Sequence, residues 1–168
     1  MSNRSIEISL ADQLLRLIEG GEVIVSYAVS SSANGSGEQM DSECTPRGQH
    51  RIDAKIGAGC PTNSVFIGRV ATGEIYDRSL RAQHPNRDWI LTRIIWLRGT
   101  EDGYNAGGNV DSKSRHIYIH GTPDDTDMSV IGSRGCIRMR NHEIEQLFNL
   151  VEEETPVNIQ DQAFSDSD

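Results

Sequence analysis

Long apolar runs are missing from this 168-residue chain. No window approaches the eighteen apolar residues that a membrane-spanning helix needs, so the sequence predicts no membrane span. The opening residues, MSNRSIEISLADQ, contain neither an apolar core nor a small-residue cleavage site, so they do not resemble a secretory signal peptide. From these two absences we expect a cytoplasmic protein, or a periplasmic one whose signal peptide has been removed.

Positive charge is also scarce. The formal net charge is −9, and only two lysines accompany fourteen arginines. Proteins that bind nucleic acid or dock on anionic lipid carry a basic face, so the composition argues against both kinds of partner. Arginine presents a planar fork that matches carboxylates, and arginines grouped near a site would favour an anionic substrate.

Cysteine is rare and irregularly spaced. Cys44, Cys60 and Cys136 form an odd set with no CxxC pair, which argues against a disulfide framework and against a structural zinc site. No HxxxH pair and no pair of carboxylates has the spacing of metal ligands. The sequence therefore predicts neither a metal nor another cofactor.

The low aromatic content of 5% and the sixteen glycines favour strands and turns over a helical bundle. Alternating or apolar segments predict strands at residues 6–9, 13–18, 23–29, 49–56, 65–70, 89–97, 116–120 and 155–159. The segment between the second and third of these, Glu-Gly-Gly-Glu, is typical of a hairpin turn. A long polar loop over residues 30–47 follows.

One amphipathic helix is expected after these strands. Asn141 is the predicted N-cap, and Ile144, Leu147, Phe148 and Val151 recur at helical spacing. With no repeat and no linker, we expect a single domain over residues 1–160, followed by an acidic, disordered tail at 161–168. The fold class is mainly β.

His120 and Cys136 are the strongest candidates for chemistry. His120 lies in an alternating segment, sixteen residues before Cys136, which follows Ser133, Arg134 and Gly135. A thiol becomes a strong nucleophile when a nearby imidazole takes its proton, and a glycine turn lets backbone amides converge on an oxyanion. On spacing alone, a buried structural cysteine and a structural histidine stay open as alternatives.

The residues around this pair carry a family resemblance. HGT at residues 120–122 and SRGCIRM at residues 133–139 closely resemble the L,D-transpeptidase catalytic domain, the YkuD-type family. TPRG at residues 45–48 is similar to the start of the family's TPxGxxxI segment, and residues 13–29 resemble its opening hairpin. The similarity covers roughly residues 6–160.

The resemblance implies a mixed β-sandwich or barrel-like fold with a helix after the catalytic cysteine. It also implies attack on an L,D-peptide bond of a peptidoglycan stem peptide. In that scheme Cys136 is the nucleophile, and His120 is the general base and later the acid. Gly135 and the Cys136 amide stabilise the oxyanion, while Ser133 supports the turn.

Four more residues are expected to contact substrate: Gly121, Arg138, Arg134 and Tyr104. Arg138 follows the nucleophile as in the family and would hold the turn or a substrate carboxylate. Tyr104 matches the approximate position of a family lid tyrosine. Arg134 replaces a histidine that the family often has, which leaves His120 as the one motif histidine able to act as base. His50 and His84 lie near turns and are expected at the surface.

A cytoplasmic member of the family would meet soluble muropeptides rather than the wall polymer. We therefore expect an L,D-carboxypeptidase that removes terminal D-alanine from peptidoglycan tetrapeptides, with water accepting the acyl group from Cys136. An L,D-transpeptidase that crosslinks two diamino acids shares the same acyl-enzyme and stays open, as does a non-catalytic module that binds wall peptides. The resemblance also suggests acylation of the thiol by β-lactams of the carbapenem type.

Overall fold

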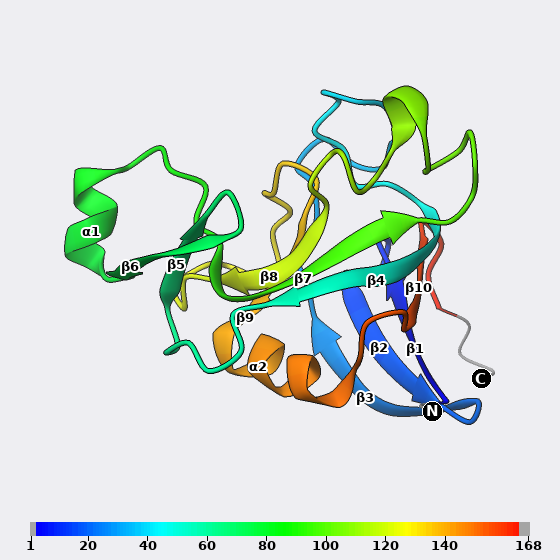
Figure 1. The fold of residues 1–168 in the computed structure, drawn as a ribbon, viewed down its shortest axis with the longest axis horizontal. Coiled ribbons are helices and arrows are strands. Elements are labelled where there is room, and N and C mark those ends of the chain that lie inside the picture. Colours follow the sequence, from blue (N-terminus) through cyan, green and yellow to red (C-terminus); the bar gives the residue numbers. More distant parts are fainter. Residues whose placement is uncertain (1–2, 165–168) are drawn as a thin grey trace.

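A computed structural model describes residues 3–164 of the chain (Figure 1). Its helices are α1 (Arg78–Gln83) and α2 (Asn141–Leu150), with a 3-10 turn at Gly108–Val110. The strands are β1 (Arg4–Ser9), β2 (Leu14–Glu19), β3 (Glu22–Ala28), β4 (Gly48–Ile56), β5 (Ser64–Ile67), β6 (Val70–Ile75), β7 (Leu91–Gly99), β8 (Tyr118–Thr122), β9 (Ile137–Arg140) and β10 (Pro156–Gln160). The mainly β class is confirmed.

The strands form one mixed sheet. Its order is β3-β2-β1-β10-β4-β7-β5-β6, with β8 beside β7 and β9 beside β8. The pairs β1–β10 and β8–β9 are parallel, whereas the other pairs are antiparallel. In Figure 1 the sheet curls so that β1–β3 lie across the interior from β7–β9, with α2 beneath β7. This is the barrel-like arrangement that the family resemblance implied.

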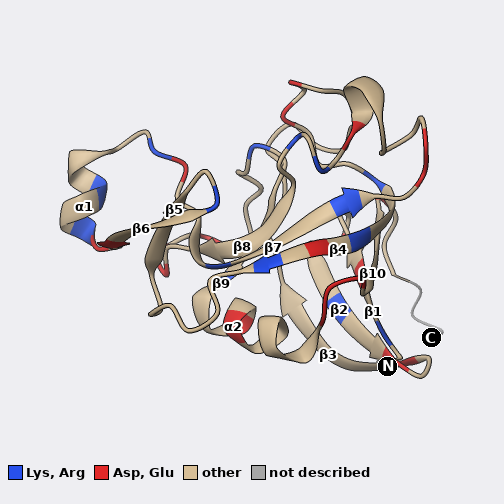
Figure 2. Cartoon of the chain, in the orientation of Figure 1, with Lys and Arg blue, Asp and Glu red and all other residues tan. Residues whose placement is uncertain are grey.

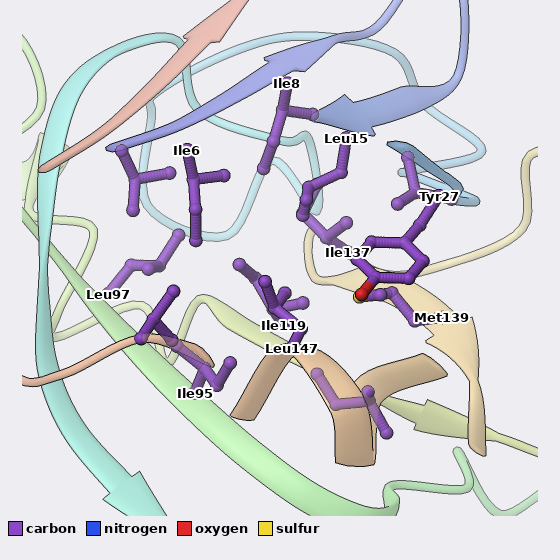
Figure 3. Close-up of a cluster of buried hydrophobic side chains, with 14 of the residues drawn as sticks. Ile6, Ile8, Leu15, Tyr27, Ile95, Leu97, Ile119, Ile137, Met139 and Leu147 are labelled. Carbon is purple, nitrogen blue, oxygen red and sulfur yellow. The ribbon is translucent and has the colours of Figure 1, made fainter. Parts of the chain in front are cut away.

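The main core fills the inside of the curl. Figure 3 shows side chains from both halves of the sheet and from α2 meeting there. Ile6 and Ile8 of β1 face Ile95 and Leu97 of β7, and Leu147 of α2 closes the cluster. The alternation that predicted β1 thus corresponds to one buried face, whereas the more apolar β7 is buried on both faces. At about 25 cal/mol per Å², burial of these side chains is the main stabilising contribution.

The same alternation decides which residues lie outside the core. Ile119 of β8 and Ile137 of β9 are fully buried in the main cluster. Their neighbours in sequence point to the opposite face of the sheet, because successive side chains of a strand alternate. Tyr118, His120 and Cys136 therefore share that opposite face. Tyr118 and Cys136 pack there in a smaller apolar cluster.

Helix α2 begins as predicted, but Asn141 is not its N-cap. The cap residue is Arg140, and Asn141 is the first helical residue with a buried side chain. Its amide oxygen accepts from the Thr92 hydroxyl at 2.6 Å, and its Nδ2 donates to Asn63 at 2.9 Å and to Asp124 at 3.1 Å. The side chain joins the helix to β7 and to two loops, so tertiary contacts override its preference for capping.

One further segment differs from the sequence prediction, whereas residues 30–47 form a loop as predicted. Residues 65–70, expected as one strand, form the hairpin of β5 and β6, with Gly68 and Arg69 at the turn in left-handed backbone conformations. The loop over residues 30–47 is held by bridges of Ser30 to Arg138 and of Ser32 to Ser133. The loop therefore lies alongside the segment that contains Cys136.

The predicted tail begins with residues that contact the domain. Asp161 pairs with Arg47 at 3.0 Å, and the Phe164 ring lies 3.8 Å below the guanidinium of Arg16. Residues 165–168, the remainder of that predicted tail, lie outside the described residues. No helix within residues 3–164 is long and apolar enough to cross a membrane.

The surface position predicted for His50 is wrong. His50 of β4 is 1% exposed, and its Nε2 lies 2.8 Å from the Ser112 hydroxyl. Its Nδ1 lies 3.0 Å from the Gly48 carbonyl oxygen. Burial lowers the pKa of His50 to about 4. The histidine is therefore a neutral link between β4 and the loop that leads to β8.

Acid is expected to destabilise the fold through His50. Below pH 6.5 this histidine binds a proton in the unfolded chain, whereas in the folded chain it binds one only near pH 4. The contribution of His50 to stability is therefore fully present above pH 6.5 and is lost as the pH falls towards 4. The expected loss of unfolding free energy between pH 7 and 4 is about 3 kcal/mol. Urea titrations of wild type and His50→Gln measure it. The slope of unfolding free energy against pH should flatten in His50→Gln but not in the control His84→Gln, whose side chain is exposed. Equal slopes in both variants would contradict the assignment.

Candidate active site

A tight turn at residues 133–136, the cysteine turn, presents Cys136 at the start of β9. The buried Ser133 closes it: the hydroxyl donates to the Cys136 carbonyl at 2.5 Å and accepts from the Gly135 N–H at 3.2 Å. Gly135 has φ = 123°, and a Cβ there would lie 3.1 Å from the Cys44 carbonyl oxygen. Serine and glycine are thus needed for the shape of this turn.

The thiol of Cys136 lies against backbone groups of the segment that enters β8. Sγ accepts from the Tyr118 N–H at 3.3 Å and donates to the His116 carbonyl oxygen at 3.3 Å. Burial raises the pKa of Cys136 to about 12, and the Tyr118 N–H acts in the opposite direction. The resting thiol is therefore protonated and needs a base before it can attack a carbonyl.

His120 has the properties of that base. Its ring is fully buried, and Nδ1–H donates to the Gly121 carbonyl oxygen at 2.6 Å, which leaves the lone pair on Nε2. Nε2 has no hydrogen-bond partner among residues 3–164. Burial lowers the pKa of His120, so the imidazole is neutral at pH 7. A neutral ring with an unengaged Nε2 can accept a proton.

Strand register brings the two residues together. β8 and β9 are parallel, with Ile119 opposite Ile137 and His120 opposite Arg138. Cys136 precedes Ile137 and so lies diagonally across from His120, on the same face. No hydrogen bond joins Nε2 to the thiol in the described part of the chain. We expect that bond to form when substrate is bound, as catalytic hydrogen bonds often tighten only in the complex.

Gly121 is held in a space that admits no side chain. A Cβ at this position would lie 2.4 Å from Asn141 Oδ1 and 2.6 Å from the Leu91 carbonyl oxygen. Its own carbonyl fixes the His120 ring. The sequence predicted that Gly121 binds substrate. In the structure Gly121 packs tightly between β7 and α2, and it contacts the candidate site through the hydrogen bond from His120 to its carbonyl oxygen.

Gly121→Ala is expected to lower the free energy of unfolding by about 1–3 kcal/mol, because a backbone carbonyl must move to admit the methyl group. Chemical denaturation measures this loss. The peptide turnover of the folded fraction should fall as well, since the ring of His120 loses its orientation. A variant with wild-type stability and turnover would show that this close approach is unimportant.

Arg138 occupies the position beside His120 on β9. One of its terminal nitrogens lies 3.2 Å from Asp88 Oδ1. A side chain at Gly132 would meet another terminal nitrogen at 2.9 Å, so this glycine makes room for the guanidinium. Arginine has five N–H donors. Among the described residues the guanidinium donates to Asp88 and its Nε has no partner, so donors of Arg138 remain for a carboxylate of the substrate.

Two cavities are lined by residues near the two ends of β8. The cavity of about 390 Å³ at the Thr122 end, named the Arg138 cavity, is also lined by Arg81, Arg87, Asp88 and Trp89. The cavity of about 330 Å³ at the His116 end, named the His116 cavity, is also lined by Met40, Arg115 and Arg134. In the chain, His120 lies between His116 and Thr122, while neither His120 nor Cys136 is among the residues that line the two cavities.

Charges of both signs line the Arg138 cavity. Arg81 pairs with Asp125 at 2.8 Å and Arg87 with Glu74 at 3.1 Å. Figure 2 shows the same interspersion over the molecule: basic positions on α1 stand next to acidic ones, and β4 carries both kinds, whereas β7 carries basic ones. Arg138 differs from the other two arginines of this cavity because it adjoins His120.

The two remaining predicted residues lie apart from each other. Arg134 is exposed and lines the His116 cavity, so its charge lies at the end of the site away from Thr122. Tyr104 is 39% exposed, and its ring lies close to Gly48. The structure does not bring Tyr104 to Cys136, and other residues line the two cavities.

Sequence reasoning missed two charged residues near the site. Arg115 donates to the Cys44 carbonyl at 2.6 Å and to the Gly37 carbonyl at 3.2 Å, which fastens the loop over residues 30–47 behind the cysteine turn. Asp88 reaches Arg138 from the segment that precedes β7. Neither lies in a motif or has a sequence spacing that links it to Cys136, so only the folded chain reveals them.

Comparison with known proteins assigns this arrangement to a family. The model of the L,D-transpeptidase catalytic domain matches residues 3–159. The chain belongs to this family. No curated protein sequence gives a significant match to it.

Solved L,D-transpeptidases share the fold of this L,D-transpeptidase domain. One from Xylanimonas cellulosilytica is 17% identical with a TM-score of 0.53, over 94% of this chain and 60% of that one. One from Enterococcus faecium is 16% identical with a TM-score of 0.54, over 95% and 50%. An L,D-transpeptidase in complex with imipenem is 16% identical with a TM-score of 0.56, over 94% and 59%. The chain thus spans between half and three fifths of their length.

Proposed function

We propose that this domain is a cysteine-dependent L,D-carboxypeptidase that removes terminal D-alanine from peptidoglycan tetrapeptides. The observation that carries the chemistry is the placement of a neutral imidazole and a neutral thiol on one sheet face. Membership of the L,D-transpeptidase family supports the peptide class. Cys136 is the proposed nucleophile and His120 the proposed base.

Acylation begins when substrate brings His120 Nε2 and the thiol together. Nε2 takes the thiol proton, and Sγ attacks the carbonyl carbon of the diamino acid. The oxyanion that develops is held by the Cys136 amide, which we prefer over Gly135 because the Gly135 N–H already donates to Ser133. Collapse breaks the C–N bond, and the imidazolium returns its proton to the leaving amine of D-alanine. A thioester remains on Cys136.

Hydrolysis repeats the sequence with water. His120 takes a proton from water, the hydroxide attacks the thioester carbonyl, and the thiolate leaves and recovers its proton from the imidazolium. The products are the tripeptide and the free enzyme. One histidine thus serves both half-reactions, as the roles of base and acid alternate.

The orientation of the peptide follows from the same histidine. His120 must lie beside the leaving nitrogen, so the leaving D-alanine belongs on the side of His120 that is away from the His116 cavity. That side holds the Arg138 cavity, where the remaining donors of Arg138 suit the terminal carboxylate of D-alanine. The His116 cavity then receives the donor peptide. A free carboxylate next to the cleaved bond is what distinguishes a carboxypeptidase substrate.

Product analysis with a defined disaccharide tetrapeptide tests the proposal. Mass spectrometry should show tripeptide and D-alanine in equal amounts. A matched tetrapeptide with a terminal carboxamide should react more slowly by about 10- to 100-fold, since it lacks the charged partner for Arg138. Unchanged tetrapeptide, or dimer alone, would overturn the carboxypeptidase assignment.

Crosslinking is the second candidate, because the family and its solved members are L,D-transpeptidases. An amine acceptor would enter through the Arg138 cavity after D-alanine leaves. The lining of that cavity combines three arginines with three aspartates, so its charge favours neither water nor an ammonium as the acceptor. Dimers joined between two diamino acids would identify the transferase.

Carbapenems are expected to acylate Cys136. A solved family member is in complex with imipenem, and the proposed thiolate would attack a strained lactam carbonyl as it attacks the peptide. Intact-mass measurement should show one adduct per chain, mapped to the peptide that contains Cys136. Cys136→Ala should give none, while an adduct on Cys44 or Cys60 in its place would contradict the assigned nucleophile.

A further inference from the structure

We infer that Asp88 is a positioning residue for the catalytic pair: its carboxylate offsets the charge of Arg138 beside His120, so that the imidazolium can form during acyl transfer. The inference rests on the roles proposed for Cys136 and His120. It does not depend on whether water or an amine accepts the acyl group.

The problem that Asp88 solves arises from strand register. His120 and Arg138 are direct partners in the parallel pair β8–β9, so their side chains leave neighbouring strands on the same face. Neighbouring strands are about 4.8 Å apart. His120 is fully buried, and the charge of Arg138 is permanent. An imidazolium next to an unpaired guanidinium in such surroundings costs free energy that would raise the barrier.

The position of the Asp88 carboxylate is fixed by its own ion pair and by the packing of its neighbours in sequence. Its Oδ1 lies 3.2 Å from a terminal nitrogen of Arg138, and both side chains are mostly buried, with 24% and 19% exposed. The next residue, Trp89, is buried and packs edge-on against Tyr76 at 5.0 Å. The preceding Arg87 lies over the Trp89 ring at 4.9 Å. The anchored neighbours fix the backbone from which the carboxylate reaches β9.

Charged groups reach the pair from several elements. Arg138 comes from β9, Arg115 from the loop before β8, and Asp88 from the segment before β7. Tyr118 beside the thiol is neutral at pH 7, with its hydroxyl bonded to Arg69 at 3.0 Å. His116 lies at the other end and is neutral at pH 7, because burial and Arg69 lower its pKa. The negative charge in this set is that of Asp88.

The carboxylate acts on the two partners with opposite consequences for catalysis. Burial lowers the pKa of His120, and Asp88 opposes this more strongly than Arg138 adds to it. Burial also raises the pKa of Cys136, and Asp88 raises it further while Arg138 and Arg115 lower it. Asp88 therefore makes the imidazolium easier to form and the thiolate harder to form.

This opposition gives a diagnostic signature for Asp88→Asn. The thiol should become more acidic, yet peptide turnover should fall, because proton transfer to His120 and on to the leaving group becomes harder. Loss of a purely structural contact would slow turnover without making the thiol more acidic. The two readouts together therefore separate positioning from general damage.

The experiment measures alkylation of Cys136 by iodoacetamide against pH, with peptide mapping to separate it from Cys44 and Cys60. In Asp88→Asn the midpoint should move to lower pH, while kcat for the tetrapeptide falls about tenfold or more. Asp125→Asn is the matched control, since Asp125 lines the same cavity but pairs with the exposed Arg81. It should leave the alkylation midpoint unchanged.

A double variant separates an effect of charge from an effect of misfolding in Asp88→Asn. Arg138→Gln should move the alkylation midpoint to higher pH, and Asp88→Asn with Arg138→Gln should return it towards wild type. The inference would be overturned if the alkylation midpoint of Asp88→Asn were unchanged or moved to higher pH. It would also be overturned if the midpoint of the double variant were as far from wild type as that of Asp88→Asn. Alkylation needs no peptide, so it remains decisive if the carboxypeptidase proposal fails.

Discussion

Cys136→Ala is expected to abolish release of D-alanine from the tetrapeptide, with a loss of at least about 10⁴-fold in kcat. Alanine has no group that forms a thioester, so the two-step route through an acyl-enzyme is closed. Chromatography of the tripeptide measures the effect. The variant should fold, because within residues 3–164 the thiol makes two hydrogen bonds, both to the backbone of the β8 segment at 3.3 Å.

Two cysteines provide matched controls for that loss. Cys44 and Cys60 are free thiols, like Cys136, and both are partly exposed. Cys44→Ala and Cys60→Ala should keep kcat within about threefold of wild type, because neither thiol belongs to the proposed catalytic pair. Retention of wild-type turnover in Cys136→Ala would remove Cys136 from the mechanism as its nucleophile.

His120→Gln is expected to lower kcat by about 10²- to 10⁴-fold, the range for loss of a general acid–base group. Glutamine preserves much of the volume of this fully buried side chain, so the fold should persist. Steady-state kinetics should show the loss mainly in kcat, since the imidazole acts on protons rather than on binding.

The dependence on pH separates His120 from other histidines. Only the neutral imidazole accepts the thiol proton, so wild-type activity should decline on the acid side as His120 becomes protonated. Because burial lowers the pKa of His120, this decline lies below the usual pH range for histidine. His142→Gln, at an exposed position of α2, should keep the wild-type profile. A His120→Gln variant with unchanged kcat and profile would contradict its assignment as the base.

Local sequence was sufficient to predict the fold class and to nominate the catalytic candidates. The alternation at residues 116–120 predicts a strand, and the same period places His120 opposite in direction to the buried Ile119. Ser133 and Gly135 mark a turn that the structure contains, with Gly135 at a left-handed φ. In each case the controlling interactions are local, or a single buried face decides the outcome.

Long-range packing explains what sequence reasoning missed. Asn141 has the right residue type for an N-cap, yet its side-chain amide forms hydrogen bonds with residues of three distant segments, Thr92, Asn63 and Asp124. His50 lies in a polar segment, but pairing of β4 with β7 and β10 buries it. Strand β9 escaped prediction because it has four residues and depends on β8 for its hydrogen bonds.

The charged network around the pair has the same origin. Asp88 and Arg138 are fifty residues apart and meet because β7, β8 and β9 are adjacent in the sheet. No pattern in either segment encodes their contact. The substitution of Arg134 for a motif histidine was visible in sequence, whereas its position on the His116 cavity was visible only in the structure.

Direct observation of the acyl-enzyme tests the central claim that Cys136 carries the acyl group to water. Wild-type protein mixed with tetrapeptide, quenched in acid and weighed intact should gain the mass of the tripeptide minus one water. Peptide mapping should place the adduct on Cys136, and the adduct should decay as free tripeptide appears. Turnover with no adduct at any quench time, or an adduct mapped to a residue other than Cys136, would contradict the account.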